Sequence, residues 1–215
     1  MHIKRQKVPK RWPIKRKGTA YVVRANSFTR GEGIPVLILI RDMLELAKNR
    51  KEVKRAIHEK KILLNGKKIN DEKNSACLFD VLTIVPSKQN YRINLDEKGK
   101  FELEKISEAD AVKKTAKIIN KKVLKGKKIQ INLSDGRNFI SNIKCKVNDS
   151  VIINFGKGIE RCIPMKEKEK VIIFSGKHTG KKAHINKLIP ERKMTQLKID
   201  GKDVNVLTKQ IMAVE

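Results

Sequence analysis

Three dipeptides that favour tight turns divide this chain into short apolar segments. Each dipeptide lies between two short segments rich in apolar residues, and the three are Asn65-Gly66, Asp135-Gly136 and Asp200-Gly201. Asn-Gly and Asp-Gly tolerate the positive φ angles that two-residue hairpin loops require, so each dipeptide predicts a β-hairpin. Turns this frequent, between strands this short, favour several small β-containing modules over one large core.

Two helices are predicted around the first hairpin. Between residues 34 and 47 apolar side chains recur at helical spacing, and a second such stretch covers residues 51–60. A strand over residues 81–85 follows the hairpin and ends at Pro86. Two helices, a hairpin and a strand within about 50 residues indicate a small unit of the α+β class.

The remainder of the chain reads mostly as strands. In the middle, residues 129–133, 139–143 and 151–155 are predicted strands, and one helix is predicted over residues 108–119 from the spacing of Ala109, Val112, Ala116 and Ile119. Near the C-terminus, residues 171–174, 185–189, 197–199 and 204–207 predict the strands of a small β-barrel. The predicted division is therefore an N-terminal extension over 1–33, a helical unit over 34–87, a central β domain over 88–168 and a β-barrel over 169–215.

The charge of the chain indicates a polyanionic partner. Of the 215 residues, 51 are Lys or Arg and 23 are Asp or Glu, which gives a formal net charge of +28. Such a charge opposes folding by self-repulsion unless a polyanion neutralises it, and nucleic acid is the first candidate. A membrane partner is not expected, because aromatic residues make up only 4% and no apolar run reaches the roughly 20 residues of a spanning helix. We expect the chain to remain inside the cell.

The N-terminal extension is the most basic segment. Residues 1–31 contain ten Lys and Arg residues and no carboxylate. We expect this segment not to fold alone and to become ordered against nucleic acid. Trp12 has two interpretations, which are stacking on a base and docking on the protein's own core. The candidate RNA-binding residues here are Lys4, Arg5, Lys7, Lys10, Arg11, Trp12, Lys15, Arg16 and Lys17.

A second basic surface is predicted on the helix over residues 51–60. Basic residues recur every three or four positions, so they share one face that suits a phosphate backbone. A merely solvated face is the alternative, and the total charge favours the phosphate interpretation. The candidates on this helix and the hairpin after it are Arg50, Lys54, His58, Lys60, Lys61, Lys67 and Lys68. Arg137 is a further candidate for a phosphate contact, although a plain hairpin turn is the favoured interpretation of the sequence SDGRN.

The stretch FSGKHTGKKAHI, residues 174–185, predicts a third anion-binding element. It is not a nucleotide-binding P-loop, because Gly176 and Gly180 are one residue too close and Lys182 replaces the required Ser or Thr. Glycines permit a tight loop with positive φ angles, and lysines supply charge. The candidates are Gly176, Lys177, His178, Gly180, Lys181 and Lys182.

No enzymatic or metal chemistry is indicated. The three cysteines are far apart without a C-x-x-C pair, and His178 and His184 have no further ligands at zinc-like spacing. No nucleophile elbow or H-E-x-x-H helix is present in the sequence. We therefore expect no catalytic residue, no bound metal, no cofactor and no small-molecule substrate.

Two motifs carry resemblances to known families. The segments IRDML, NRKEVKRAI, KKILLNGKKI and FDVLTI resemble the RNA-binding domain of bacterial small-subunit ribosomal protein four, tyrosyl-tRNA synthetases and many pseudouridine synthases. In that domain Gly usually stands where this chain has Lys60. The pattern V-x-x-x-S-G-K-x-x-G-K from Val171 resembles the KOW motif of ribosomal proteins and transcription elongation factors, with Ala183 where a further Gly is common.

Taken in order, the motifs resemble one family over nearly the whole chain. HIKR and PKRWPI at the N-terminus, the two-helix domain, NLSDGRN in the centre and the KOW-like loop resemble small-subunit ribosomal protein four of the archaeal and eukaryotic type. The resemblance implies a multi-module α+β fold with an SH3-like barrel at the C-terminus. It also implies a structural protein of cytoplasmic small subunits that binds ribosomal RNA beside neighbouring ribosomal proteins.

Two other functions fit single parts of the sequence. An RNA-modifying enzyme of the pseudouridine synthase type would share the RNA-binding domain, but it would need a catalytic Asp in a large separate domain. A transcription elongation factor would share the KOW-like barrel and would bind RNA polymerase. Activity on a uridine-containing transcript, or binding to polymerase, would favour these alternatives.

Overall fold

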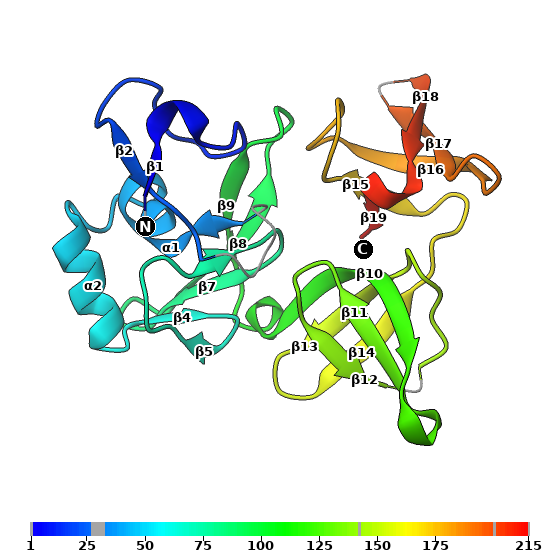
Figure 1. Ribbon diagram of the computed structural model, residues 1–215, viewed down its shortest axis with the longest axis horizontal. Helices are drawn as coiled ribbons and strands as arrows, with labels where there is room; N and C mark the ends of the chain where they lie inside the picture. The colour runs from blue at the N-terminus through cyan, green and yellow to red at the C-terminus, as the bar shows by residue number, and fades with distance from the viewer. Residues whose placement is uncertain (1, 27–32, 142, 200, 215) are drawn as a thin grey trace. The chain divides into compact units, whose positions relative to one another are not determined.

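The computed structural model describes residues 2–26, 33–141, 143–199 and 201–214. Contacts divide the chain into two units, one formed by residues up to 94 together with 100–112, the other by 95–99 together with residues from 113 onward (Figure 1). Several β-sheets and few helices occur, which confirms a mixed α and β protein. None of the helices in the described ranges is long and apolar enough to cross a membrane.

The first unit combines short helices with three sheets. A five-stranded sheet has the order β5-β4-β7-β8-β9, and two small sheets pair β1 with β2 and β3 with β6. The elements are β1 His2–Lys4, η1 Arg5–Lys7, β2 Tyr21–Val23, β3 Ile34–Pro35, α1 Val36–Ile38, η3 Leu39–Met43, α2 Arg50–His58, β4 Ile62–Leu64, β5 Lys67–Lys68, β6 Ser75–Ala76, β7 Val81–Ile84, β8 Gln89–Leu95, β9 Phe101–Ile106 and η4 Asp110–Val112.

The first predicted helix is shorter and less amphipathic than its sequence pattern indicates. Residues 34 and 35 pair as a strand with β6, and the helical turns cover only 36–43. Every residue from Ile34 to Ile40 is buried, so no polar face exists in this run. The last turns are π-helical, because the Leu44 amide donates to the Leu39 carbonyl, five residues back, at 3.0 Å.

The second helix and the first hairpin confirm the sequence pattern. Asn49 caps α2, since its Oδ1 accepts a 3.0 Å hydrogen bond from the Glu52 amide. Beyond the helix, Lys60 has φ +59, the left-handed conformation that explains why Gly is common at this position in the related domain. Leu64 pairs with Lys67 across the Asn65-Gly66 turn, whose φ angles are +53 and +72.

The N-terminal segment is part of the first unit, which corrects the expectation that it orders only against nucleic acid. β1 pairs with β2, the Phe101 amide donates to the Arg11 carbonyl at 2.9 Å, and the Asn26 amide donates to the Lys73 carbonyl. Trp12 and Val22 are buried, at 5% and 6% exposure. The segment therefore gains enough apolar burial and backbone pairing to be held by the rest of the unit. Residues 27–32 of the predicted extension, including Arg30, lie outside the described residues.

The second unit contains two five-stranded antiparallel sheets. Their orders are β12-β11-β10-β13-β14 and β18-β17-β16-β15-β19. The elements are β10 Lys113–Val123, η5 Lys125–Lys127, β11 Ile129–Leu133, β12 Asn138–Ile140, β13 Ser150–Asn154, β14 Gly158–Ile163, β15 Lys170–Ile173, β16 Lys182–Ile189, β17 Met194–Ile199, β18 Lys202–Leu207, η6 Thr208–Gln210 and β19 Ile211–Ala213. The Asp135-Gly136 hairpin is confirmed, and β17 and β18 also pair as a hairpin, although Asp200 of its turn lies outside the described residues.

The helix predicted over residues 108–119 is wrong. Only residues 110–112 form a single helical turn, and β10 begins at Lys113. β10 pairs with β13 over its first half and with β11 over its second half, so hydrogen bonding to other strands overrides the local helical spacing. Ala116 and Ile118, two positions apart, are both buried, as expected for one face of a strand.

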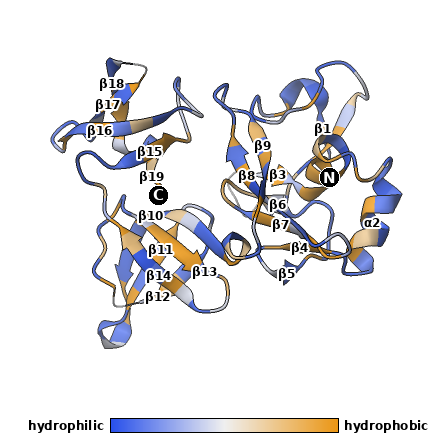
Figure 2. Cartoon of the chain, turned by 180° about the vertical axis from the view of Figure 1, so that it is seen from behind, coloured by the Kyte–Doolittle hydropathy of each residue, from blue (hydrophilic) through white to orange (hydrophobic). Residues whose placement is uncertain are grey.

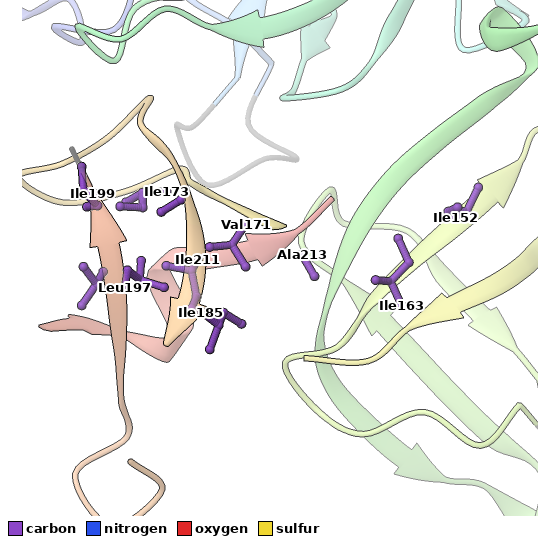
Figure 3. Packing of buried hydrophobic residues seen from close by; sticks show 11 residues of the cluster. Ile152, Ile163, Val171, Ile173, Ile185, Leu197, Ile199, Ile211 and Ala213 are labelled. Carbon is purple, nitrogen blue, oxygen red and sulfur yellow. The ribbon is translucent and has the colours of Figure 1, made fainter. Parts of the chain in front are cut away.

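The C-terminal sheet has a core of aliphatic side chains that point toward one another, as the close-up in Figure 3 shows. Val171, Ile173, Ile185, Leu197 and Ile211 are each at most 1% exposed. Ile152 and Ile163 of the other sheet belong to the same buried cluster. Figure 2 shows hydrophobic residues concentrated on strands such as β11 and β13, while connecting loops are largely hydrophilic.

Candidate nucleic-acid interface

The predicted basic residues form three surfaces, each within one unit. The N-terminal surface contains the described basic residues from Lys4 to Lys17, and the helical surface contains those from Arg50 to Lys68. The C-terminal loop runs from Gly176 to Lys182. Most of these side chains are exposed, but several are engaged by the protein itself, and those pairings decide which of them are available to a ligand.

Arg5 in the N-terminal surface organises a basic loop. Its Nε donates to the Thr19 carbonyl at 2.6 Å, Nη1 donates to the Lys15 carbonyl at 2.6 Å, and Nη2 donates to the Thr19 hydroxyl at 2.8 Å. All three guanidinium nitrogens are thus directed at the loop, while Lys15, Arg16 and Lys17 are exposed. Arg5 positions this loop, because its planar set of donors matches three acceptors at once.

Replacing Arg5 with Lys is expected to loosen the loop, although the charge is retained. A lysine ammonium cannot reproduce the three directed bonds, and loss of charge-assisted bonds costs roughly 1–2 kcal/mol of loop order, or about tenfold in opening. Limited trypsin cleavage after Lys15, Arg16 or Lys17, followed by mass spectrometry, should therefore accelerate about tenfold. Arg16→Lys is the matched control, and equal cleavage rates in the two variants would contradict the positioning role of Arg5.

Trp12 resolves the choice between stacking and docking. Its side chain is buried, so in this structure it packs on the protein's own core and presents no ring for a base. The exposed aromatic residue of this region is Tyr21, at 56%, which the sequence analysis did not identify. The alternation of β2 carried the signal, since Val22 faces inward and its neighbours therefore face outward.

A buried carboxylate engages two residues of the helical surface. Glu72 is 4% exposed, and the Arg50 guanidinium donates to its Oε1 from Nε at 2.9 Å and also from Nη2. The Lys54 ammonium is 4.0 Å from the same oxygen. Glu72 was not predicted, because it lies 22 residues from Arg50 in a segment without periodicity. The positive charge of Arg50 is therefore largely neutralised by Glu72 within the protein.

The helical surface borders a groove that Glu72 also lines. Lys54 and His58 of α2 and Lys60 of the turn after it line the groove together with Lys68 of β5. The structure thus brings together four predicted residues from the helix, the turn that follows it and β5. Lys61 points instead to Glu59 in an ion pair, and Lys67 is exposed.

Gly180 in the C-terminal loop is fixed by the protein. Its φ is +93, and a Cβ at this position would lie 1.9 Å from the Asp96 carbonyl oxygen. The Gly180 amide donates to the Ile173 carbonyl at 2.7 Å, and the residue is buried. The glycine therefore serves a close approach between this loop and the turn at 95–99 within the second unit. This position favours a structural role for Gly180 over the RNA contact predicted from the sequence.

The charged part of the loop remains accessible. Lys177 and Lys182 are exposed, Lys181 and His178 are half-buried, and Gly176 is exposed with φ +99. The Thr179 hydroxyl donates to the Gly176 carbonyl at 2.6 Å and closes the turn. The loop thus presents lysines from a backbone held in one conformation.

The SDGRN turn contains a buried ion pair. The Lys114 ammonium donates to Asp135 Oδ2 at 2.8 Å, and the side chains are 1% and 5% exposed. Burial alone would raise the pKa of Asp135, but the Lys114 ammonium and the Arg137 amide bring the net pKa below its usual value. Arg137 lies 3.6 Å from the same carboxylate and 5.6 Å from the centre of the Phe155 ring. These contacts favour the structural interpretation of this turn.

Lys117 of β10 is a second buried lysine. Its ammonium donates to the carbonyls of Thr208 and Ile211, the latter at 2.7 Å, and lies 5.9 Å from the centre of the Phe174 ring. Burial lowers the pKa of Lys117 to about 7. Lys117 thus links β10 to η6 and to the first residue of β19. Its burial disfavours the protonated, charged form of the side chain.

The stability of the protein is expected to rise with pH through Lys117. Between about pH 7 and the ordinary lysine pKa of 10.5, the unfolded chain binds a proton here that the folded chain does not. The free energy of unfolding therefore increases with pH in this window, by up to about 1.4 kcal/mol per pH unit. In urea titrations the wild type should gain stability relative to Lys117→Met as pH rises, whereas it should run parallel to the exposed-lysine control Lys122→Met. Parallel profiles for all three proteins would refute the lowered pKa.

Similar proteins with known names exist. Residues 87–158 match the family described as ribosomal family S4e. Proteins named small ribosomal subunit protein eS4 are similar to this chain in Methanocella arvoryzae, with 36% identity over 83% of this chain and 77% of the relative, and in Nanoarchaeum equitans, with 36% identity over 87% and 82%. The relative of the same name in Archaeoglobus fulgidus is 34% identical over 97% and 89%.

One solved structure supports the fold. The crystal structure of the 30S ribosomal protein S4e from Thermoplasma acidophilum matches with a TM-score of 0.73 and 24% identity, covering 85% of this chain and 95% of that chain. At that identity the match concerns the arrangement of the backbone. It shows that a chain of this architecture has been observed experimentally.

Proposed function

Because the chain belongs to the ribosomal family S4e, we propose that it is a structural constituent of the small ribosomal subunit that acts by binding the RNA of that subunit. The observation that carries this proposal is 36% identity, over 83% of this chain, to a small ribosomal subunit protein eS4. The protein is a structural component and not an enzyme. The alternatives of an RNA-modifying enzyme or a transcription elongation factor are not favoured.

The proposed mechanism uses the three basic surfaces together. Each surface neutralises phosphates, and joining them in one chain raises the effective concentration of the second and third contacts once the first has formed. Double-stranded RNA hides its base edges in a deep, narrow major groove, so affinity would come mainly from phosphate contacts and RNA shape. The residues we propose to contact RNA first are the exposed Lys15, Arg16 and Lys17, the groove lysines Lys54, Lys60 and Lys68, and Lys177 and Lys182 of the C-terminal loop.

The module arrangement is part of the proposal. We infer a two-helix RNA-binding domain over 34–87, a central β domain over 88–168 and a KOW-type, SH3-like barrel over 169–215. The five-stranded antiparallel sheet β18-β17-β16-β15-β19 supports the barrel, and the Asn65-Gly66 hairpin beside α2 supports the RNA-binding domain. Neighbouring ribosomal proteins and a place in cytoplasmic small subunits complete the proposal.

Sedimentation of a native cell extract tests the proposed function. Lysate is separated on sucrose gradients at low and at moderate salt, and the protein is followed across the fractions by mass spectrometry. Co-migration with the small subunit at both salt concentrations is expected. Absence from free subunits and from whole ribosomes would overturn the proposal, and co-migration with RNA polymerase would support the elongation-factor alternative instead.

A further inference from the structure

The exposed face of the two-stranded N-terminal sheet carries an aromatic ring surrounded by basic residues. Lys4 pairs with Tyr21 and His2 pairs with Val23, so these four residues share the face opposite to Ile3 and Val22. Val22 is buried, which directs Tyr21 outward. Among the described Phe, Tyr and Trp residues, Tyr21 is the one that is exposed, at 56% for the whole residue. The exposed Tyr21 side chain leaves apolar surface in contact with water, which does not stabilise the fold.

Tyr21 is held in place by its neighbours. The rings of His2 and Tyr21 meet edge to face, with centroids 4.5 Å apart and planes at 71°. The Tyr21 carbonyl accepts a 3.1 Å hydrogen bond from the Thr19 hydroxyl, which itself accepts from Arg5. The ring is therefore attached to the same framework that positions the basic loop.

Two hollows of the surface meet at Tyr21. One is lined on its basic side by Lys4, Arg5, Arg16 and Lys17, and contains no acidic residue. The other extends from His2 and Tyr21 toward Arg41, Asp42 and Glu45. Tyr21 contributes to both hollows, and so do Arg5 and Lys17. The combination places the ring directly beside a cluster of cations in the first hollow, whose lining has no acidic residue.

We propose that Tyr21 is a stacking platform for one unpaired RNA base, whose phosphate lies in the hollow lined by Lys4, Arg16 and Lys17. Single-stranded nucleotides are bound in this way, by an aromatic ring under the base and cations along the backbone. A bare phosphate or a duplex backbone would contact the cations but would place no base on the Tyr21 ring. The inference rests on the proposed function and specifies the kind of RNA element that reaches this surface.

Filter binding with labelled RNA tests the platform. The probes are a short single strand, a duplex of the same length and intact small-subunit RNA, each with the full-length protein. Tyr21→Ala should weaken binding of the single strand about tenfold, as expected for one lost base–aromatic stack, and should leave duplex binding unchanged. Tyr21→Phe retains the ring and should bind like the wild type. Val85→Ala, which truncates another exposed apolar residue of this unit, is the matched control.

The outcomes separate the two proposals. Unchanged single-strand binding by Tyr21→Ala, or equal losses for single strand and duplex, would overturn the platform while the proposed function stands. Lower incorporation of Tyr21→Ala into subunits with unchanged binding to all three RNAs would overturn it too, and would assign the ring to a protein neighbour. If the wild type fails to bind small-subunit RNA at all, the proposed function itself fails.

Discussion

Replacing Asp135 with Asn is expected to destabilise the second unit by about 3–5 kcal/mol, because the change removes the buried carboxylate that accepts the hydrogen bond of the buried Lys114 ammonium. Both side chains are at most 5% exposed, so water cannot replace the lost partner. Urea denaturation monitored by circular dichroism measures the effect. The double variant Lys114→Met with Asp135→Leu removes both charges and should recover most of the loss, since buried ion pairs are often replaceable by apolar pairs.

The neighbouring lysine of the same strand supplies the control. Lys113 pairs with Glu160 at 3.0 Å, but the two side chains are 48% and 45% exposed. Glu160→Gln should therefore cost at most about 1 kcal/mol. The effect of acid on the buried pair is also predictable, because the pKa of Asp135 is lowered in the folded protein. The contribution of Asp135 to stability is therefore complete above the ordinary aspartate pKa and is lost as the pH falls through the lowered pKa. A loss at neutral pH that is no larger for Asp135→Asn than for Glu160→Gln would contradict the importance of the buried pair.

Gly180→Ala is expected to cost about 2–6 kcal/mol, the sum of backbone strain and overpacking. The added methyl group would stand 1.9 Å from the Asp96 carbonyl oxygen, which belongs to backbone and cannot rotate away. The turn at 95–99 must therefore separate from the C-terminal loop. Denaturation measures the loss, and hydrogen exchange of the Gly99 amide, which donates to that Asp96 carbonyl at 2.7 Å, should accelerate.

Gly126→Ala isolates the strain component. Gly126 has φ +74, but a Cβ there would meet nothing within 4 Å. Its substitution should cost only the left-handed conformation, about 1–2 kcal/mol. Similar losses for the two alanine variants would show that the close approach at Gly180 contributes nothing.

Local chemistry made the hairpins predictable. The Asn65-Gly66 and Asp135-Gly136 turns carry their own φ requirement, and the strands that flank them formed as expected. The helix predicted over 108–119 did not form because β10 depends on its partner strands: residues of β11 and β13 that lie 6 to 41 positions further along the chain pair with it. The helix predicted from residue 34 onward is shorter than expected, in part because the segment from Ile34 to Ile40 is buried on all sides and has no polar–apolar periodicity that would mark its ends.

The residues of the candidate site were predictable from the sequence, but their hydrogen-bond and packing partners were not. The three basic surfaces follow from residue type and spacing. The partners that modify them do not, because Glu72 reaches Arg50 across 22 residues and Asp96 meets Gly180 across a longer separation. Arg5 illustrates the consequence, since a residue predicted from its charge acts through the directions of its hydrogen bonds.

The burial of Trp12 gives the protein a built-in spectroscopic reporter. It is the single tryptophan of the chain, and its indole is shielded from water within the first unit. Indole emission moves to longer wavelength when water reaches the ring, so the intrinsic fluorescence of this protein follows one place on the chain. The docking of the N-terminal segment can thus be watched without a label, separately from the unfolding of the second unit.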